Sequence, residues 1–320
     1  MKLSFDTIRS ISVGAIRVWE ENGNIRFSKG TQKQIDAWYA FEPVLGERAE
    51  TTTGIRLDLH TNSSKFAFTA AMGNRFEIYV NDVMMYNIML DKDNRSFSID
   101  IDKSISEENR VTLILPSHEI CVLKSVEVDD GATVKPHSFD CKLLMIGDSI
   151  TQGWESGYDS LSYAYRVSRA FNAHSVIYGI GGGFFHESVL DDELDFEPDA
   201  ITVAFGTNDW GRRKTLEALK KNTKEFFDKL RARYPHTLIF GISPLWRADK
   251  DQVKPSGSFK EITDAVKEEI LAHGAILVDG ELMTPHLPEF FSDGFLHPNA
   301  LGFGIYAENL VRVMNPYLKK

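Results

Sequence analysis

The two halves of the chain differ in their pattern of hydrophobic and polar positions. In the first half, short runs alternate between apolar and polar residues, as at Ile55, Leu57 and Leu59. A period of two places one side of a strand in a core and the other in solvent. Many short strands separated by turn residues, without a long segment of helical period, predict an antiparallel β-sandwich. The strand candidates lie around residues 55–59, 66–68, 76–80, 83–90, 97–101, 111–115 and 126–128.

The second half alternates short apolar runs with longer stretches of helical period. Runs this short and this apolar are typical of parallel strands that are covered on both faces. Strand and helix in alternation predict an α/β/α three-layer domain of flavodoxin-like type with a central parallel sheet. The strand candidates are 143–146, 175–178, 200–205, 237–242 and 275–278, and the helix candidates are 161–171, 214–234, 259–273 and 299–317.

A break between these patterns predicts a domain boundary near residue 136. Asp129-Asp130-Gly131 and Pro136-His137 interrupt the strand pattern. At about 150 residues per domain, a chain of 320 residues fits two domains. We therefore expect a β-sandwich over 1–136 and an α/β/α domain over 137–320. The early aromatic residues are expected in the core or at an edge of the sandwich, namely Trp19, Trp38, Tyr39 and Phe41.

Composition narrows the classes of partner. The chain has 36 Lys and Arg against 46 Asp and Glu, a formal charge of −10, and such a chain repels nucleic acids and anionic membranes. Its two cysteines exclude a disulfide scaffold. No histidine has a spacing typical of a metal site, and no Walker lysine follows the glycine-rich segment, so neither a metal nor another cofactor is predicted. The amino terminus shows no apolar segment of signal or membrane length, which predicts a cytoplasmic protein.

Candidate chemistry lies directly after the predicted parallel strands, where such sheets bind ligands. A serine hydroxyl needs a base, normally histidine, to act as a nucleophile. The tetrahedral intermediate of acyl transfer needs hydrogen-bond donors for its oxyanion. A serine, glycines, an asparagine and a histidine at different strand ends supply these parts. The segments are Gly147-Asp148-Ser149, Gly179-Ile180-Gly181-Gly182-Gly183, Gly206-Thr207-Asn208-Asp209 and His297-Pro298.

This ordered set resembles the motifs of the SGNH/GDSL hydrolase family over residues 140–320. The resemblance implies that Ser149 is the nucleophile and that its own N–H is an oxyanion donor. Gly182 would add a backbone N–H and Asn208 its side-chain amide, while His297 would be the general base. Gly181 competes with Gly182 for the oxyanion role. Asp148 is expected to order the loop rather than to take part in the chemistry.

One departure from the family pattern concerns the third member of the triad. The family usually places an aspartate three residues before the histidine, but that position is Gly294 and the aspartate is Asp293. Either the loop accommodates the extra residue, or a backbone carbonyl orients His297. Trp210 and Trp246 also follow strand ends. They would either line the substrate pocket or pack in the core.

The resulting hypothesis is a serine esterase that hydrolyses carboxylic esters through an acyl-enzyme. A short acyl group is favoured, such as acetyl on a carbohydrate, because the sequence shows no pattern that indicates a long apolar groove or a lid. The first half resembles the jelly-roll module that precedes the catalytic domain in some family members. The alternatives are an acyltransferase or thioesterase with the same site, or an inactive glycan-binding protein. The expected partner is a small ester substrate, and the oligomeric state stays open.

Overall fold

The computed structural model describes residues 1–104, 106–213 and 215–318, which form two compact units. Unit 1 comprises Met1–Thr31 and Glu50–Phe139, and unit 2 comprises Gln32–Ala49 and Asp140–Lys320. This division differs from 1–136 and 137–320 mainly because residues 32–49 belong to unit 2. Lys214, at the start of a predicted helix, lies outside the described residues.

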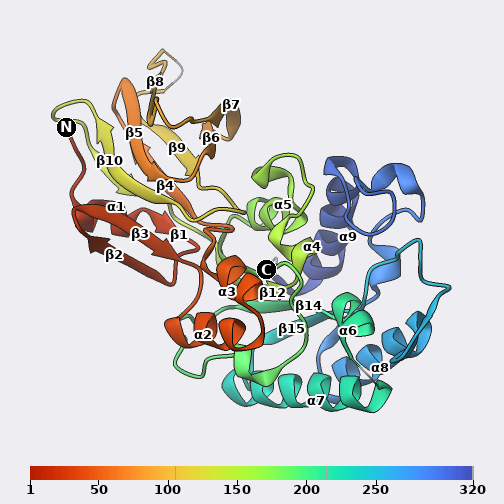
Figure 1. Cartoon of the computed structure of the whole chain (residues 1–320). Helices are drawn as coiled ribbons and strands as arrows, with labels where there is room; N and C mark the ends of the chain where they lie inside the picture. Colours follow the sequence, from red (N-terminus) through yellow and green to blue (C-terminus); the bar gives the residue numbers. More distant parts are fainter. Residues whose placement is uncertain (105, 214, 319–320) are drawn as a thin grey trace. The chain divides into compact units, whose positions relative to one another are not determined.

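Unit 1 contains two antiparallel sheets (Figure 1). One has the order β1-β4-β9-β6-β7, with β11 also paired to β4, and the other has the order β2-β3-β10-β5-β8. A short helix, α1 (Phe5–Ser10), precedes them. The strands are β1 (Ser12–Val13), β2 (Arg17–Glu21), β3 (Asn24–Ser28), β4 (Arg56–Thr61), β5 (Lys65–Met72), β6 (Arg75–Val80), β7 (Val83–Met89), β8 (Ser96–Asp100), β9 (Asn109–Ile114), β10 (Val122–Val128) and β11 (Val134–Pro136).

Both sheets of unit 1 contribute to one hydrophobic core. Phe68 on β5 and Phe76 on β6 belong to different sheets, and their ring centroids lie 4.8 Å apart. Alternate residues of the strands point into this core, which confirms the predicted sandwich. The core includes Ile25, Phe27, Leu57, Leu59, Phe66, Ile78, Ile99, Val111, Leu113, Leu123 and Val126.

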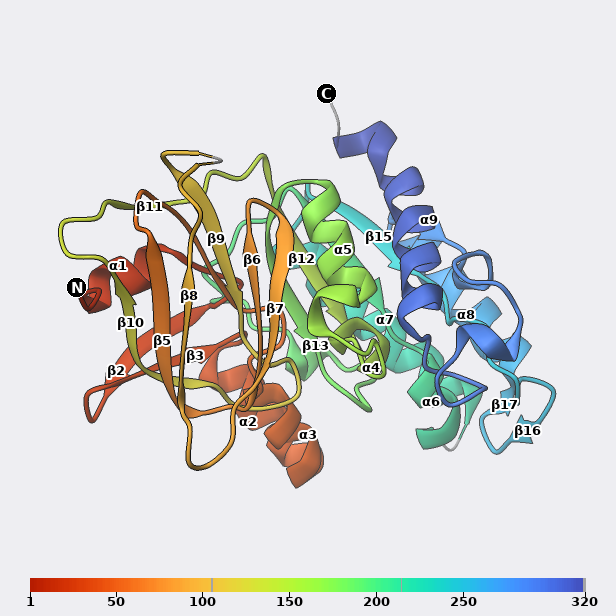
Figure 2. The ribbon, with the colours of Figure 1, turned by 90° about the horizontal axis from the view of Figure 1, so that it is seen from above.

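Unit 2 is built on a parallel sheet with the order β13-β12-β14-β15-β18. Helices α5 and α9 cover one face, and α7 and α8 cover the other (Figures 1 and 2). The predicted α/β/α domain is therefore confirmed. The strands are β12 (Cys141–Gly147), β13 (Ala173–Gly179), β14 (Ala200–Ala204), β15 (Leu238–Ile242), β18 (Ile276–Val278) and the hairpin β16 (Val253–Lys254) with β17 (Gly257–Ser258). The helices are α4 (Ser149–Gln152), α5 (Tyr163–Ala170), α6 (Thr207–Arg212), α7 (Leu216–Arg233), α8 (Phe259–Ala272) and α9 (Ala300–Leu318), with 3₁₀ turns η1 (Asp159–Leu161), η2 (Glu187–Val189), η3 (Gly280–Leu282) and η4 (Pro288–Phe290).

The strand order of unit 2 determines where a ligand site forms. β12 lies between β13 and β14, so the chain moves to one side of β12 and then crosses to the other. Such a switch point opens a crevice at the carboxyl ends of the strands. The loops after β12, β13 and β14 meet at this edge.

A helical hairpin that interrupts unit 1 in sequence belongs to unit 2. It consists of α2 (Gln32–Phe41) and α3 (Pro43–Glu50), where no helix was predicted. Trp38 and Phe41 therefore pack in unit 2 and not in the sandwich. Trp38 is fully buried, and its Nε1 donates to the Tyr178 hydroxyl at 3.1 Å. Tyr39 is 38% exposed and lies over Gly46 of the same hairpin, whereas Trp19 lies on the edge strand β2 as expected.

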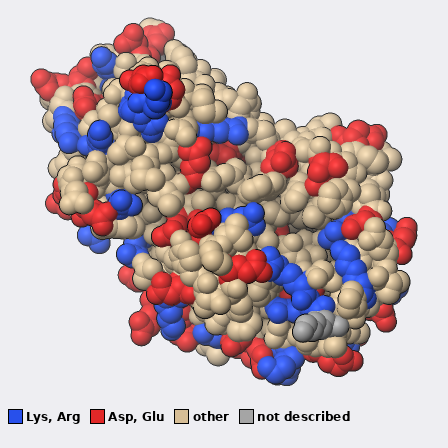
Figure 3. Space-filling model, in the orientation of Figure 1, with Lys and Arg blue, Asp and Glu red and all other residues tan. Residues whose placement is uncertain are grey.

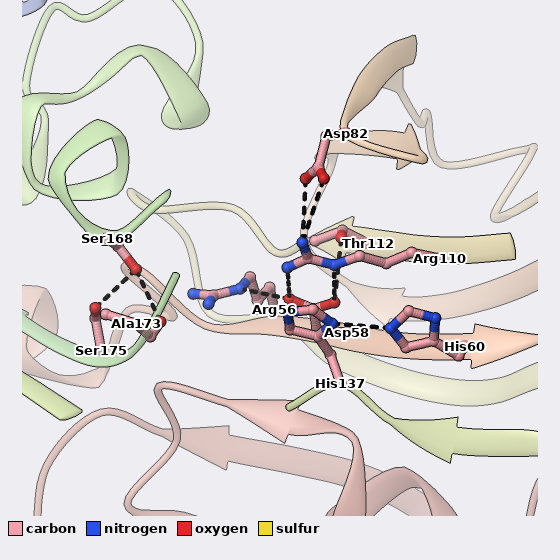
Figure 4. A network of polar contacts seen from close by, with 10 residues as sticks. All are labelled: Arg56, Asp58, His60, Asp82, Arg110, Thr112, His137, Ser168, Ala173 and Ser175. Atoms are coloured by element: carbon pink, nitrogen blue, oxygen red, sulfur yellow. Dashed lines mark hydrogen bonds and ion pairs between the residues drawn. The ribbon is translucent and has the colours of Figure 1, made fainter. Parts of the chain in front are cut away.

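Figure 4 shows two groups of polar contacts, one in each unit. In unit 1, the Asp58 carboxylate accepts from Arg110 Nε and Nη2 at 2.8 Å and from Arg56 Nε at 3.2 Å. Burial alone would raise the pKa of Asp58, but these arginines hold it below its usual range. In unit 2, Ser175 Oγ donates to Ser168 Oγ at 2.7 Å and ties β13 to α5.

Candidate active site

Ser149 is the first residue of the short helix that follows β12. The Asp148 side chain caps this helix, because it accepts a hydrogen bond from the Ile150 N–H at 2.9 Å. A first-turn N–H has no acceptor within its own helix. The loop therefore presents the Ser149 hydroxyl and its N–H together at the end of β12, with the residue 7% exposed.

A chain of hydrogen bonds joins Ser149, His297 and Asp293. Ser149 Oγ lies 3.0 Å from His297 Nε2, and His297 Nδ1 lies 2.7 Å from Asp293 Oδ2. Because a carboxylate only accepts, the hydrogen of the neutral ring is on Nδ1, and Nε2 is free to accept from the serine. The spacing of four residues is accommodated by a tight turn, in which Gly294 adopts a φ of +74°.

The same turn fixes the Asp293 carboxylate. Its Oδ1 accepts hydrogen bonds from the backbone N–H groups of Phe295, Leu296 and His297 at 3.0, 2.8 and 3.1 Å. Burial alone would raise the pKa of Asp293, but these N–H groups and the His297 ring hold it below its usual range. The carboxylate is consequently ionised at neutral pH and holds the His297 ring in place.

The loop after β13 contains three glycines whose N–H groups differ in their partners. Gly181 N–H donates to the Gln152 side chain at 2.7 Å, and Gly183 N–H donates to the Ile180 carbonyl at 2.8 Å. Within the described chain, the Gly182 N–H makes no hydrogen bond. Gly182 also has a φ of +79°, which favours glycine. This geometry favours Gly182 over Gly181 as a donor to a ligand.

Asn208 extends toward the same loop from the end of β14. Its Nδ2 donates to the Gly183 carbonyl at 2.9 Å. A side-chain amide carries two N–H groups. One therefore holds the glycine loop, and the other can serve a ligand. The residue is partly exposed.

Sequence reasoning missed two residues that connect these loops. Arg48 on α3 donates from Nη1 to the Gly181 carbonyl at 2.8 Å, and its guanidinium lies 5.3 Å from the centre of the Trp154 ring. Trp154 N–H donates in turn to the Ser149 carbonyl at 2.9 Å. Trp154 was within reach of sequence reasoning, since it follows Ser149 by five residues. Nothing in the sequence connects Arg48 with the site, because it lies in the half of the chain that was predicted to form the sandwich.

The two tryptophans considered for the substrate pocket pack in the interior. Trp210 is fully buried, and its Nε1 donates to the Gly257 carbonyl at 2.9 Å. Trp246 is 8% exposed and packs against His286 and Phe291 at ring-centroid distances of 5.5 and 5.0 Å. Their place in the fold is that of core aromatics.

Two buried acids lie behind the loops. Burial raises the pKa of Asp148 to about 7, and the nearby Asp209 carboxylate adds to the shift. Burial also raises the pKa of Asp209 to about 6, although Arg213 opposes it. A cavity of about 20 Å³, enough for roughly one water, lies beside Asp148. These acids support the loops from the interior.

The model of the GDSL-like lipase/acylhydrolase family matches residues 145–305, just over half of the chain. The chain belongs to this family. As a family member it is a hydrolase that acts on ester bonds. The matched residues begin within β12 and include each residue of the Ser149, Gly182, Asn208 and His297 set. No curated protein matches the sequence.

Solved structures share the architecture of this GDSL-family chain. A salicylyl-acyltransferase, SsfX3, from a tetracycline biosynthetic pathway is 20% identical with a TM-score of 0.80, over 95% of this chain and 94% of that one. A family two carbohydrate esterase from Cellvibrio japonicus is 16% identical with a TM-score of 0.70, over 99% and 97%. The acetyl xylan esterase Est2A from the rumen bacterium Butyrivibrio proteoclasticus is 17% identical with a TM-score of 0.59, over 83% and 89%. At these identities the likeness shows the fold.

Within 1–104, 106–213 and 215–318, no helix has the length and apolar character needed to span a membrane. Over the same residues, no group of three or more His, Cys, Asp or Glu side chains is placed to hold a metal ion.

Proposed function

We propose that the chain hydrolyses short-chain carboxylic esters through an acyl-enzyme on Ser149. The observation that carries the proposal is the hydrogen-bond chain from Ser149 Oγ to His297 Nε2 and from Nδ1 to Asp293. As Oγ attacks the ester carbonyl, its proton passes to Nε2, and the carboxylate stabilises the imidazolium that forms. The imidazolium then protonates the leaving alcohol. Water, activated by the same ring, releases the acid and restores Ser149.

The oxyanion is assigned to three donors, the N–H groups of Ser149 and Gly182 and the Asn208 amide. Each comes from a different strand end of one parallel sheet, so the donors are fixed before the substrate binds. Such preorganised donors lower the barrier because they act on charge that develops only in the transition state. Asp148 stays outside the chemistry and holds the turn in which Ser149 lies.

We assign acetyl groups on carbohydrate as the favoured substrates. Support comes from the structural relatives that are named as carbohydrate esterases and as an acetyl xylan esterase. The salicylyl-acyltransferase among the relatives supports a second candidate, transfer of the acyl group to an alcohol other than water. Both reactions share the acyl-enzyme and differ only in its acceptor.

A substrate panel tests this proposal. Purified protein is assayed on 4-nitrophenyl esters of increasing acyl length and on acetylated xylan and monosaccharides, with Ser149→Ala as the control. We expect turnover that is fastest for acetyl and absent in the variant. Products are followed with and without added alcohols, because a new ester in their presence would identify a transferase. Turnover that survives in Ser149→Ala, or no turnover on any ester, would contradict the proposal.

A further inference from the structure

Two arginines from unit 2 lie beside Gly182, the assigned oxyanion donor, and a glutamate pairs with one of them. Measured from the point where a Cβ on Gly182 would lie, Arg48 Nη1 is at 3.1 Å and Arg212 Nη2 is at 3.4 Å. Leu45 Cδ2, from the same hairpin as Arg48, is at 3.3 Å. The hairpin formed by α2 and α3 therefore brings side chains to the site although it is distant in sequence from every motif of the family.

The third charged member is Glu42, which lies between α2 and α3. It forms an ion pair with Arg212 through Nη1, and Arg212 Nη2 lies 3.5 Å from its other oxygen. The hydrogen bond from Arg212, aided by the charge of Arg48, holds the pKa of Glu42 below its usual range. Glu42 is therefore ionised at neutral pH. The three side chains together carry a net charge of +1, on a chain whose total charge is −10.

Contacts with neighbouring groups hold both guanidinium groups in position. Arg48 is fixed by the Gly181 carbonyl and the Trp154 ring, and Arg212 lies 5.3 Å from the centre of the Phe184 ring. The Arg212 side chain remains 31% exposed, so solvent and ligands reach it. Figure 3 shows basic side chains gathered over α6, the helix that ends at Arg212. A fixed, accessible positive group beside the oxyanion donor is suited to an anion on the substrate.

From this arrangement we infer that the site selects esters that carry a carboxylate close to the scissile bond, which Arg48 and Arg212 bind. The inference rests on the proposed esterase function and specifies its substrate class. A guanidinium carries five N–H donors, so each arginine can donate to a substrate carboxylate in addition to the bonds it already makes. One carboxylate also balances the net charge of +1. A phosphate monoester, with about −1.5 to −2 at neutral pH, would leave excess negative charge beside Glu42.

The test compares matched charged and neutral esters. One pair places the charge on the alcohol side, 4-acetoxybenzoate and its methyl ester. The other pair places the charge on the acyl side. It consists of the mono-4-nitrophenyl ester of adipate, which has a free carboxylate, and the same compound with that carboxylate methylated. For each pair the measured quantity is the ratio of kcat/KM for the charged ester to that for the neutral one. We expect wild-type protein to favour the charged member of at least one pair, through a lower KM.

Three variants are expected to change the ratio of kcat/KM values differently: one lowers it, one raises it and one leaves it unchanged. Arg212→Gln removes a positive charge and should lower the ratio by about tenfold, in the range of a partly exposed charge-assisted hydrogen bond. Glu42→Gln removes the negative charge and should raise the ratio several-fold. Lys221→Gln removes an exposed lysine that pairs with Glu225 on α7, and it controls for the total charge of the protein. It should leave the ratio as in wild type. High salt should reduce the preference for the charged ester, because it screens exposed charges.

The outcomes separate the two claims. A ratio that falls in Arg212→Gln and rises in Glu42→Gln supports the carboxylate site, and the pair that responds identifies the side of the ester. A ratio that is insensitive in both pairs, or an equal loss of kcat on charged and neutral esters, overturns it. In that case the cluster only supports the glycine loop, while turnover that depends on Ser149 still upholds the esterase function. No turnover of any ester would instead overturn the esterase function itself.

Discussion

Replacement of Asp293 by asparagine tests whether the carboxylate works through the histidine. In the native turn, Oδ1 accepts from three backbone N–H groups and Oδ2 accepts from His297 Nδ1. Asparagine preserves an oxygen for the backbone but places an N–H₂ where Oδ2 was. Two donors then face each other. The ring can avoid this only if its hydrogen moves from Nδ1 to Nε2. Nε2 can then no longer accept the proton of Ser149.

The expected size of the effect follows from this change of tautomer. Loss of the orienting acid lowers kcat by roughly 10³–10⁴ in triads of this type, or about 4–5.5 kcal/mol of barrier. The loss of stability should be much smaller, about 1 kcal/mol, because the turn keeps its backbone acceptor and the Asp293 side chain is 25% exposed. Steady-state hydrolysis of 4-nitrophenyl acetate measures the first quantity, and the melting temperature measures the second.

A matched control is available in unit 1. Asp91 Oδ1 accepts from the N–H groups of Asp93 and Asn94 at 2.8 and 2.7 Å, in a turn that contains no histidine. Asp91→Asn should therefore leave kcat at the wild-type value while it removes the same charge from a similar turn. A loss of only a few-fold in Asp293→Asn would refute the triad. The triad would also be refuted if the activity of Asp293→Asn fell only in proportion to the fraction of protein that is unfolded.

Three further predictions address the oxyanion site, the helical hairpin and the buried acid. Asn208→Ala should lower kcat by roughly 10²–10³ with little change in KM, and an effect on KM alone in steady-state kinetics would make Asn208 a substrate-binding residue. Trp38→Ala should cost about 3–5 kcal/mol in urea denaturation, since Trp38 is fully buried and donates to Tyr178, and a cost below about 1 kcal/mol would show that the hairpin is dispensable. For Asp148, burial raises the folded-state pKa from 3.8 to about 7, so its contribution to stability is present below about pH 4 and is lost as the pH rises through about 7. Between about pH 5 and pH 8, Asp148→Asn should therefore lose less unfolding free energy than wild type, by about 2–3 kcal/mol, and equal losses would refute burial as the cause of the shift.

The fold of unit 2 was predictable because its signals are local. Each parallel strand is a short apolar run between helical stretches, and the motifs stand directly after the strands. Neighbouring parallel strands end at one edge of their sheet, so the strand order alone brings Ser149, Gly182 and Asn208 together. The contact between Asp293 and His297 requires a tight turn at Gly294. The sequence allows this turn but does not require it, so the contact could not be predicted with the same certainty as the strand ends.

The hairpin of residues 32–49 was not predictable in the same way. Its helices have ten and eight residues and are separated by Glu42, so each shows too few apolar repeats to reveal a helical period. Its partners lie more than a hundred residues away, as with Trp38 and Tyr178 or Arg48 and Gly181. Such pairings depend on tertiary packing and leave no periodic trace in the sequence. Arg48 and its neighbours consequently emerged only from the structure.

The most direct measurement of the central claim is the mass of the protein during turnover. Wild-type protein is mixed with 4-nitrophenyl acetate, quenched in acid, and analysed by mass spectrometry intact and after digestion. The account predicts a population heavier by one acetyl group, with the group on the peptide that contains Ser149 and absent from Ser149→Ala. If the wild-type protein hydrolyses the ester but acetyl groups appear only on residues other than Ser149, the acyl-enzyme mechanism is contradicted.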